Sequence, residues 1–421
     1  MMKAQRFILK LLSVVTAVWM IPAVVCFASD KAGGEKSGPA VTVWTIHPDP
    51  VKGKMTRFSL GSDVVLTGTS SEVAIPFDQV IRVESESDRL RVIRKTASTL
   101  RLQGGSLLFE LVDGDWVVAK PLGCSEDRCR LGLGDGAELT TSPGAIDSLR
   151  SRNATLPSRS DAVESLLAVR SRDEDRVLLT NGDVLHGFIG RVDANGLTVE
   201  NGGGEVVVPY SVVVAAKFAS EPTPLPGRPF VRIHLLTGAR LTCPTFDISE
   251  GEVTASYIDG EIVSLKPEAI GRIDVIGGRW QGLSSLRPLT YEHTPMLGLA
   301  WEFRRNRNVV GGPLVVAGRS FETGLGVHSR SRLSFELKGQ FHEFVTRFGL
   351  DDSAGPLADV DVSVLVDGIA RFSRKGVRAG VLSDAVRLEV ERANRIELVV
   401  DFGENGDIQD RFDWIEPGLI R

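Results

Sequence analysis

The chain has 421 residues, with 49 Lys and Arg against 54 Asp and Glu and a formal net charge of −5. A mildly acidic chain of mixed charge excludes the concentrated basic surface that nucleic-acid binding requires. Its hydrophobic content of 42% and its 44 glycines indicate a globular, turn-rich protein of roughly two to four domains.

Residues 1–28 have the pattern of a signal peptide. Lys3, Arg6 and Lys10 form a basic start, residues 11–25 are almost entirely apolar, and a cleavage site follows at Ala28. The sequence therefore predicts a secreted, periplasmic or cell-surface protein. The alternative is an uncleaved segment, and only then do we expect a membrane anchor.

Two cysteines enclose a short loop. Because an exported chain meets an oxidising environment, we predict a disulfide between Cys124 and Cys129. A metal site is a poor alternative, since no second Cys/His pair lies nearby at ligand spacing. Cys243 stands between apolar residues and is expected to be a buried small side chain rather than a nucleophile.

The middle of the chain contains a repeat that is marked by glycine turns. Pairs of these turns lie 22 residues apart and suit tight hairpins, because glycine accepts a positive φ. The paired glycines are Gly114 and Gly136, Gly182 and Gly204, and Gly238 and Gly260. Apolar segments that precede the first turn of each pair predict β-strands at 107–112, 176–179 and 230–236.

This repeat predicts small β units that pack on their neighbours. The expected units are a degenerate copy at 41–97 and further copies at 98–150, 176–221 and 228–277. Residues 151–175 are expected to be a linker that contains one short helix. The strand pattern suggests SH3-like or Sm-like barrels, an analogy that carries no function. We expect the units to act as a spacer or a docking surface.

The C-terminal region predicts an antiparallel β-sandwich. Apolar and polar residues alternate along the segments 333–337, 360–366, 386–390 and 396–402, so each strand has one buried and one exposed face. With the repeats before it, this region completes a chain of all-β class.

Five segments of this region occur in the order and spacing of a known family. They are residues 315–321, 324–329, 348–352, 364–368 and 410–414. Together they resemble the NPCBM family of carbohydrate-binding modules, which have a galactose-binding-like jelly-roll fold. The resemblance covers residues 285–421 and implies glycan recognition by a C-terminal jelly-roll β-sandwich. The chain departs from the family at Arg411 and Phe412, where a loop rich in histidine is expected.

The candidate sugar site combines aromatic and polar side chains. Aromatic faces cover the apolar side of a sugar ring, while polar groups bind its hydroxyls. The candidate platforms are Trp301 and Trp414, and the candidate polar contacts are His328, Arg330 and Asp352. Each also has a structural interpretation, as a core aromatic, a histidine bonded within the fold or a solvated charge.

Two acidic loops suggest a structural Ca²⁺. Asp351 lies in one loop and Asp407 and Asp410 in the other, and carboxylate oxygens are the ligands that Ca²⁺ prefers. The alternative is that these groups form surface ion pairs with Arg347 and Arg411.

No catalytic motif is complete in the sequence. His342-Glu343 begins like a zinc-protease motif, but Thr346 stands where the second histidine is needed. The predicted function is therefore that of an exported, non-catalytic protein that binds a cell-wall, capsular or environmental glycan. A galactose-like or other cell-surface sugar is the expected ligand.

Two other functions remain open at this stage. One is an envelope protein that binds other proteins and has lost its sugar site. It would have both candidate tryptophans buried under a flat polar loop surface, whereas sugar binding would have both exposed in one groove. The other is a hydrolase or a glycoside hydrolase-associated protein, which would need a pocket with two facing carboxylates.

Overall fold

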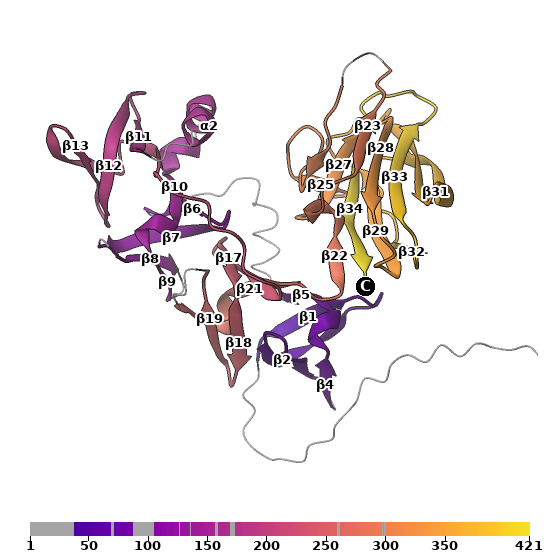
Figure 1. Cartoon of the computed structure of the whole chain (residues 1–421), viewed down its shortest axis with the longest axis horizontal. Helices are drawn as coiled ribbons and strands as arrows, with labels where there is room; N and C mark the ends of the chain where they lie inside the picture. The colour runs from indigo at the N-terminus through magenta and orange to yellow at the C-terminus, as the bar shows by residue number, and fades with distance from the viewer. Residues whose placement is uncertain are drawn as a thin grey trace, which may run out of the picture.

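The computed structural model describes residues 38–421 except 69–70, 87–104, 126, 135, 156–158, 169–172, 259–261, 297 and 299. The predicted signal peptide at 1–28 lies outside the described residues, as do parts of the expected units at 41–97 and 98–150. Within the described part of the chain, no helix has the length and apolar character needed to cross a bilayer. Figure 1 shows an array of small β units beside a C-terminal sandwich.

Four five-stranded units make up the array, and the predicted all-β class is confirmed. Unit 1 consists of β1 (Ala40–Thr45), β2 (Val51–Ser59), β3 (Val64–Thr67), β4 (Glu72–Ile75) and β5 (Val80–Ser85). Unit 2 consists of β6 (Leu107–Leu111), β7 (Trp116–Cys124), β8 (Cys129–Gly134), β9 (Ala137–Thr141) and β10 (Ile146–Arg150). Unit 3 consists of β11 (Asp175–Leu179), β12 (Val184–Val192), β13 (Gly196–Asn201), β14 (Gly204–Pro209) and β15 (Val213–Lys217).

Unit 4 has the same plan, with its second strand interrupted at Pro244. It consists of β16 (Phe230–Leu235), β17 (Arg240–Cys243), β18 (Thr245–Ser249), β19 (Glu252–Ser256), β20 (Ile262–Leu265) and β21 (Ile270–Ile276). In every unit the first strand pairs with the second and the fifth, and the third strand pairs with the fourth. All these pairings are antiparallel, so tight turns suffice to connect most of the strands.

The repeat of the sequence corresponds to this shared plan. Gly114 and Gly182 both adopt positive φ in the turn after the first strand, which explains the glycine at this position. A 3₁₀ turn precedes the fifth strand in units 1, 2 and 4, at Phe77–Gln79, Pro143–Ala145 and Pro267–Ala269. Alternating side chains such as those of β6 point inward, and the four units share one hydrophobic core.

The units associate in pairs through equivalent strands. The fifth strands β5 and β21 join unit 1 to unit 4, and the second strands β2 and β18 also pair. The fifth strands β10 and β15 join unit 2 to unit 3 in the same manner. The fourth strands β9 and β20 then connect unit 2 to unit 4. The spatial order of the units is therefore 1–4–2–3.

The expected linker at 151–175 contains helix α2 (Ser160–Ala168). Val163 and Leu166 of this helix are buried and pack against Leu178 and Val214 of unit 3. Helix α2 is therefore fixed on the unit that follows it.

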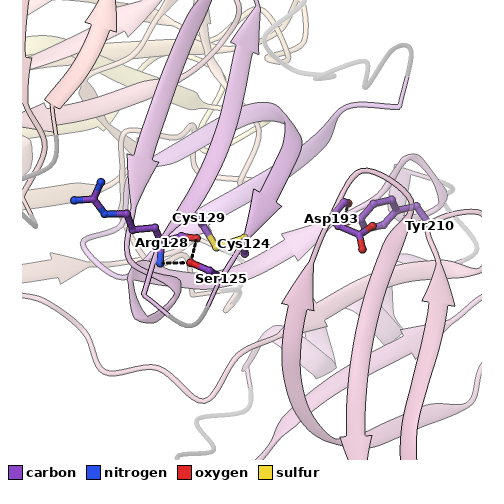
Figure 2. The surroundings of a disulfide bond; sticks show 6 residues. All are labelled: Cys124, Ser125, Arg128, Cys129, Asp193 and Tyr210. Atoms are coloured by element: carbon purple, nitrogen blue, oxygen red, sulfur yellow. Dashed lines mark hydrogen bonds between the residues drawn. A yellow bond between two sulfur atoms is a disulfide. The ribbon is translucent and has the colours of Figure 1, made fainter.

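A disulfide joins Cys124 to Cys129 in the turn between β7 and β8. Figure 2 shows its surroundings, where Asp193 and Tyr210 of unit 3 also appear. The Tyr210 hydroxyl donates to the Asp193 carbonyl oxygen at 2.8 Å. Cys243 is free and buried, and this burial raises the pKa of its thiol, so it lacks the thiolate that a nucleophile needs.

The C-terminal module is a sandwich of two antiparallel sheets around its own core. One sheet contains β22 (Trp280–Gly282), β24 (Arg304–Arg305), β27 (Gly324–His328), β29 (Glu343–Leu350), β32 (Val386–Glu389) and β34 (Arg411–Ile420). The other contains β23 (Thr290–His293), β28 (Ser331–Glu336), β30 (Asp359–Val366), β31 (Ile369–Arg378) and β33 (Arg395–Phe402). A separate hairpin is formed by β25 (Leu314–Val316) and β26 (Arg319–Phe321). Because β22 pairs with β34, the sandwich begins before residue 285.

Charged side chains connect the module to units 1 and 4. Arg82 of β5 forms an ion pair with Glu416 of β34, and Arg272 of β21 lies 3.2 Å from Glu322. Burial opposes ionisation of Glu416, but Arg82 together with Arg272 and Arg347 outweighs it and holds the pKa of this carboxyl below its ordinary value. The charged form of Glu416 is therefore the one that this contact favours.

Candidate functional site

The candidate site lies at the end of the sandwich that faces away from the repeats. Strand β34 runs from this end toward the repeats, near which the C-terminus lies (Figure 1). Strands β23 and β27 both finish where β34 begins, because His328 pairs with Arg411 and His293 pairs with Ser331, just after the β27–β28 turn. The loops after these two strands carry Trp301 and Arg330, and His328 is the last residue of β27.

The backbone of Trp301 is held by two side chains of β23. The Tyr291 hydroxyl donates to the Trp301 carbonyl oxygen at 2.5 Å. The Trp301 N–H donates to Nδ1 of His293 at 3.2 Å. The Trp301 side chain is half-buried, so the fold presents its aromatic ring on a fixed backbone.

Trp301 and His328 form a parallel stack. Their ring centroids are 5.1 Å apart and their planes differ by 6°, while His293 meets His328 edge-on at 6.1 Å. The structure thus brings together two of the residues predicted from sequence. One face of the Trp301 ring is covered by the imidazole of His328, which is itself only 5% exposed.

The hydrogen bond of His328 defines its tautomer. Its Nδ1 lies 2.9 Å from the Ser329 carbonyl oxygen, and a carbonyl can only accept, so Nδ1 carries the hydrogen. Burial lowers the pKa of His328 and is the largest influence on it, so the ring is neutral at pH 7. Its Nε2 is therefore a hydrogen-bond acceptor, the group that a sugar hydroxyl needs.

Asp407 of the β33–β34 loop and Arg411, the first residue of β34, both act on His328. The carboxylate of Asp407 favours the protonated ring, and the guanidinium of Arg411 opposes it. Asp407 also accepts a bond from the Met296 N–H at 3.0 Å, and Arg411 donates to the Ser353 carbonyl oxygen at 2.7 Å. The site thus has an aromatic ring, a neutral acceptor and charged groups of both signs.

The prediction that Trp414 is a sugar platform is wrong. Its side chain is 0% exposed and packs against Phe348 and Phe412, with ring centroids 5.8 and 5.2 Å away. A ring enclosed in the sandwich core has no face for a ligand. Trp414 therefore stabilises the fold.

Arg330 and Asp352 have structural contacts of their own. Arg330 follows a cis peptide bond from Ser329, and its guanidinium pairs with Asp401 at 3.3 Å. Asp352 accepts bonds from the N–H groups of Ala317 and Gly318, each at 2.8 Å. Asp352 thus fastens the turn of the β25–β26 hairpin.

The three predicted calcium ligands do not form one ligand set. Asp351 is buried and accepts bonds from Asn308 at 3.1 Å and from the Val315 N–H at 3.0 Å. Asp410 is buried and accepts from the Ser329 hydroxyl at 2.6 Å. In the described part of the chain, the acidic and histidine side chains close enough to share an ion are His234, Asp274 and Glu322. The predicted residues therefore do not fit a shared Ca²⁺.

Asp413 is a buried acid of β34. Its side chain is 0% exposed, and neither carboxyl oxygen has a hydrogen-bond partner among the described residues. Burial, followed by the charge of Asp351, raises the pKa of Asp413 to about 10. The carboxyl group is therefore protonated at neutral pH.

The extent of the sandwich, which begins at β22, agrees with one family model. Residues 281–420 match the NPCBM/NEW2 domain. The resemblance predicted for residues 285–421 is confirmed. The NPCBM/NEW2 domain accounts for the C-terminal sandwich, and the four units before it lie outside the match. No curated protein matches the chain.

Several solved structures are similar to parts of the chain. A CBM51 module of Clostridium perfringens GH95 in complex with methyl-galactose is 21% identical, covering 33% of this chain and 99% of that chain with a TM-score of 0.30. Tandem CBM51 modules of Sp3GH98 from Streptococcus pneumoniae SP3-BS71 are 14% identical, covering 75% and 88% with a TM-score of 0.31.

Sequence reasoning missed the two residues that hold Trp301. Tyr291 and His293 alternate on β23 and so share one face, but their partner is the backbone of a loop, which leaves no mark in the sequence. The alternation of Phe412 and Trp414 did carry a signal. Two aromatic residues two positions apart on a strand share a face, and here that face is the core.

Proposed function

We propose that this chain is an exported, non-catalytic carbohydrate-binding protein. The C-terminal module binds a galactose-like or other cell-surface sugar at its distal end, and the four units serve as a spacer or docking surface. The stack of Trp301 on His328 carries this proposal. It combines a fixed aromatic ring for the C–H face of a sugar with a neutral acceptor for a hydroxyl.

The surroundings of the stack support a neutral sugar as ligand. The Asp407 carboxylate can accept from hydroxyl groups, and the Arg411 guanidinium can donate to them. Sugar binding predicted both Trp301 and Trp414 exposed in one groove, and protein binding predicted both buried. Trp301 is half-buried and Trp414 is buried, so the tryptophans meet neither expectation in full. The match to the NPCBM/NEW2 domain points to the same class of ligand.

The test is glycan binding by the full chain and by Trp301→Ala. A glycan array identifies a ligand, with methyl galactoside as the first probe for calorimetry, in the presence of Ca²⁺ and of a chelator. We expect Trp301→Ala to weaken binding by at least about tenfold, because the aromatic face contributes much of the affinity. Phe321→Ala removes a half-buried aromatic elsewhere on the module and is the matched control.

Two results contradict the proposal. One is a wild-type chain that retains no glycan at millimolar concentration, with or without Ca²⁺. The other is equal affinity of the wild type and Trp301→Ala for the same sugar, which would place the site elsewhere.

A further inference from the structure

The fourth strand of unit 3 is an apolar sheet edge. Among the described residues, β14 pairs with β13 and with no other strand. Its two central side chains are open to solvent, with Val206 47% and Val207 67% exposed. Folded proteins usually protect such edges with charge, proline or a covering element, because a bare edge pairs readily with another strand. In β14 the charge and the proline, Glu205 and Pro209, lie toward the ends of the strand and leave the valines between them open.

In unit 2 the equivalent fourth strand, β9, is covered by another strand. Leu139 of β9 and Val206 of β14 each lie opposite a core residue of the third strand, Leu131 and Val199. Leu139 is 0% exposed, whereas Val206 is 47% exposed. The fourth strand of unit 2 pairs with β20, and the fourth strand of unit 3 has no such cover.

The cover in unit 2 is itself the fourth strand of another unit. Strands β9 and β20 run antiparallel, with Ser264 opposite Glu138. Units 2, 3 and 4 can be aligned at the first residue of their fifth strands. These residues are Ile146, Val213 and Ile270, which pair with Leu111, Leu179 and Leu235. In this alignment Ser264 corresponds to Val207, and Glu138 corresponds to Glu205.

We propose that β14 pairs antiparallel with β14 of a second copy of this chain. In the register of the β9–β20 contact, Val206 lies opposite Val206 of the second copy. Val207 of each copy then lies opposite Glu205 of the other copy, so the symmetric contact contains two such pairs. The arrangement brings β-branched side chains together and keeps the two Glu205 carboxylates apart.

The other free fourth strand, β4 of unit 1, fits this edge less well. It carries Ala74 at the position of Val207 and is largely half-buried. A contact between β14 and β4 would also be heterologous and would extend into an open chain of molecules, whereas the contact of β14 with itself closes as a dimer. The exposed valines of β14 complement each other best.

Two substitutions at Val207 test the pairing and its register. Val207→Asp places a carboxylate opposite Glu205 of the second copy, and Val207→Lys places an ammonium there. Both remove the same apolar side chain at the same exposed position, so both should fold alike by circular dichroism. Since like charges directly opposite are destabilising, we expect Val207→Asp to weaken the dimer at least about tenfold.

Val207→Lys should keep the dimer, and the double variant Glu205→Lys with Val207→Asp should restore it. Ile369→Asp changes a similarly exposed side chain of the module, 59% exposed, and should have no effect. The measurement is sedimentation equilibrium of the full-length chain up to about 100 µM.

Several outcomes overturn the proposal. The proposal is wrong if the wild-type chain is monomeric at every concentration measured. It is also wrong if the Val207→Asp variant dimerises as strongly as the wild type. Equal weakening by Val207→Asp and Val207→Lys would exclude this register. Growth beyond a dimer would identify β4 as the occupant of the edge in place of β14.

Discussion

Replacing Asp413 by asparagine should stabilise the module at neutral pH. The folded chain holds a proton on this buried carboxyl because its pKa is raised from 3.8 to about 10. The unfolded chain releases that proton above about pH 4. Folding therefore takes up a proton between these two values, and stability falls as the pH rises through that window.

The loss of stability at pH 7 can be calculated from the pKa of Asp413 in the unfolded chain. At pH 7 the medium is about three pH units above the pKa of the unfolded chain, and each unit corresponds to about 1.4 kcal/mol. The cost at pH 7 is therefore on the order of 4 kcal/mol. Asparagine has nearly the same shape and no proton to lose, so Asp413→Asn should recover up to about this amount at pH 7 and nothing at pH 4.

Asp410→Asn is the matched control. Asp410 is also 0% exposed, but it accepts bonds from the Ser329 hydroxyl at 2.6 Å and from the Asp359 N–H at 3.1 Å. Burial also raises the pKa of Asp410 to about 6, so the gain from removing this acid should stop growing near pH 6, and the loss of one of two acceptor atoms offsets it. For Asp413→Asn the gain should keep growing through pH 7 and 8.

The assay is the unfolding of the full chain by urea at pH 4, 5, 6, 7 and 8, with the transition of the module followed by tryptophan fluorescence. Loss of stability in Asp413→Asn at pH 7 would refute the reasoning. If that loss also required Ca²⁺, the carboxylate would be a metal ligand rather than a neutral acid.

Three further predictions concern other parts of the chain. Sugar affinity should stay constant from about pH 8 to 6.5 and fall at lower pH, since protonation of His328 removes its acceptor; a decline that begins above pH 7, measured by calorimetry, would contradict this. Arg82→Ala should cost about 2–3 kcal/mol in urea unfolding, because Glu416 is left unpaired, whereas an unchanged midpoint would mean that the contact is not formed. Reduction of the Cys124–Cys129 disulfide, with a sequence separation of five, should cost about 2 kcal/mol or less, and complete unfolding on reduction would disagree.

The local plan of the repeats could be predicted from the sequence. Gly114 and Gly182 mark turns that need positive φ, and Pro143 and Pro267 mark the 3₁₀ turns before the fifth strand. These features depend on the conformation of a few neighbouring residues. The pairing of unit 1 with unit 4 could not be predicted, because β5 and β21 carry the same apolar alternation as every other fifth strand.

The candidate site was predictable only in part. His328 follows two glycines that lie in close contact with backbone, such as Gly326 against Asn308, and this made it a candidate. Its stacking on Trp301 joins two separate loops, so the contact depends on the whole sandwich. Trp414 was misplaced because an aromatic residue near acidic groups suggests a ligand site, while the alternation with Phe412 indicated the core.

The nested order of the four units has a consequence for how the chain folds. Units 2 and 3 follow each other along the chain and pair through β10 and β15, so this half can form early during synthesis. Unit 1 must wait for its partner strand, since β5 pairs with β21 nearly two hundred residues later. Contacts of such long range close slowly, and β5 remains an open edge until then. We expect the first unit of this protein to be the last to reach its final state.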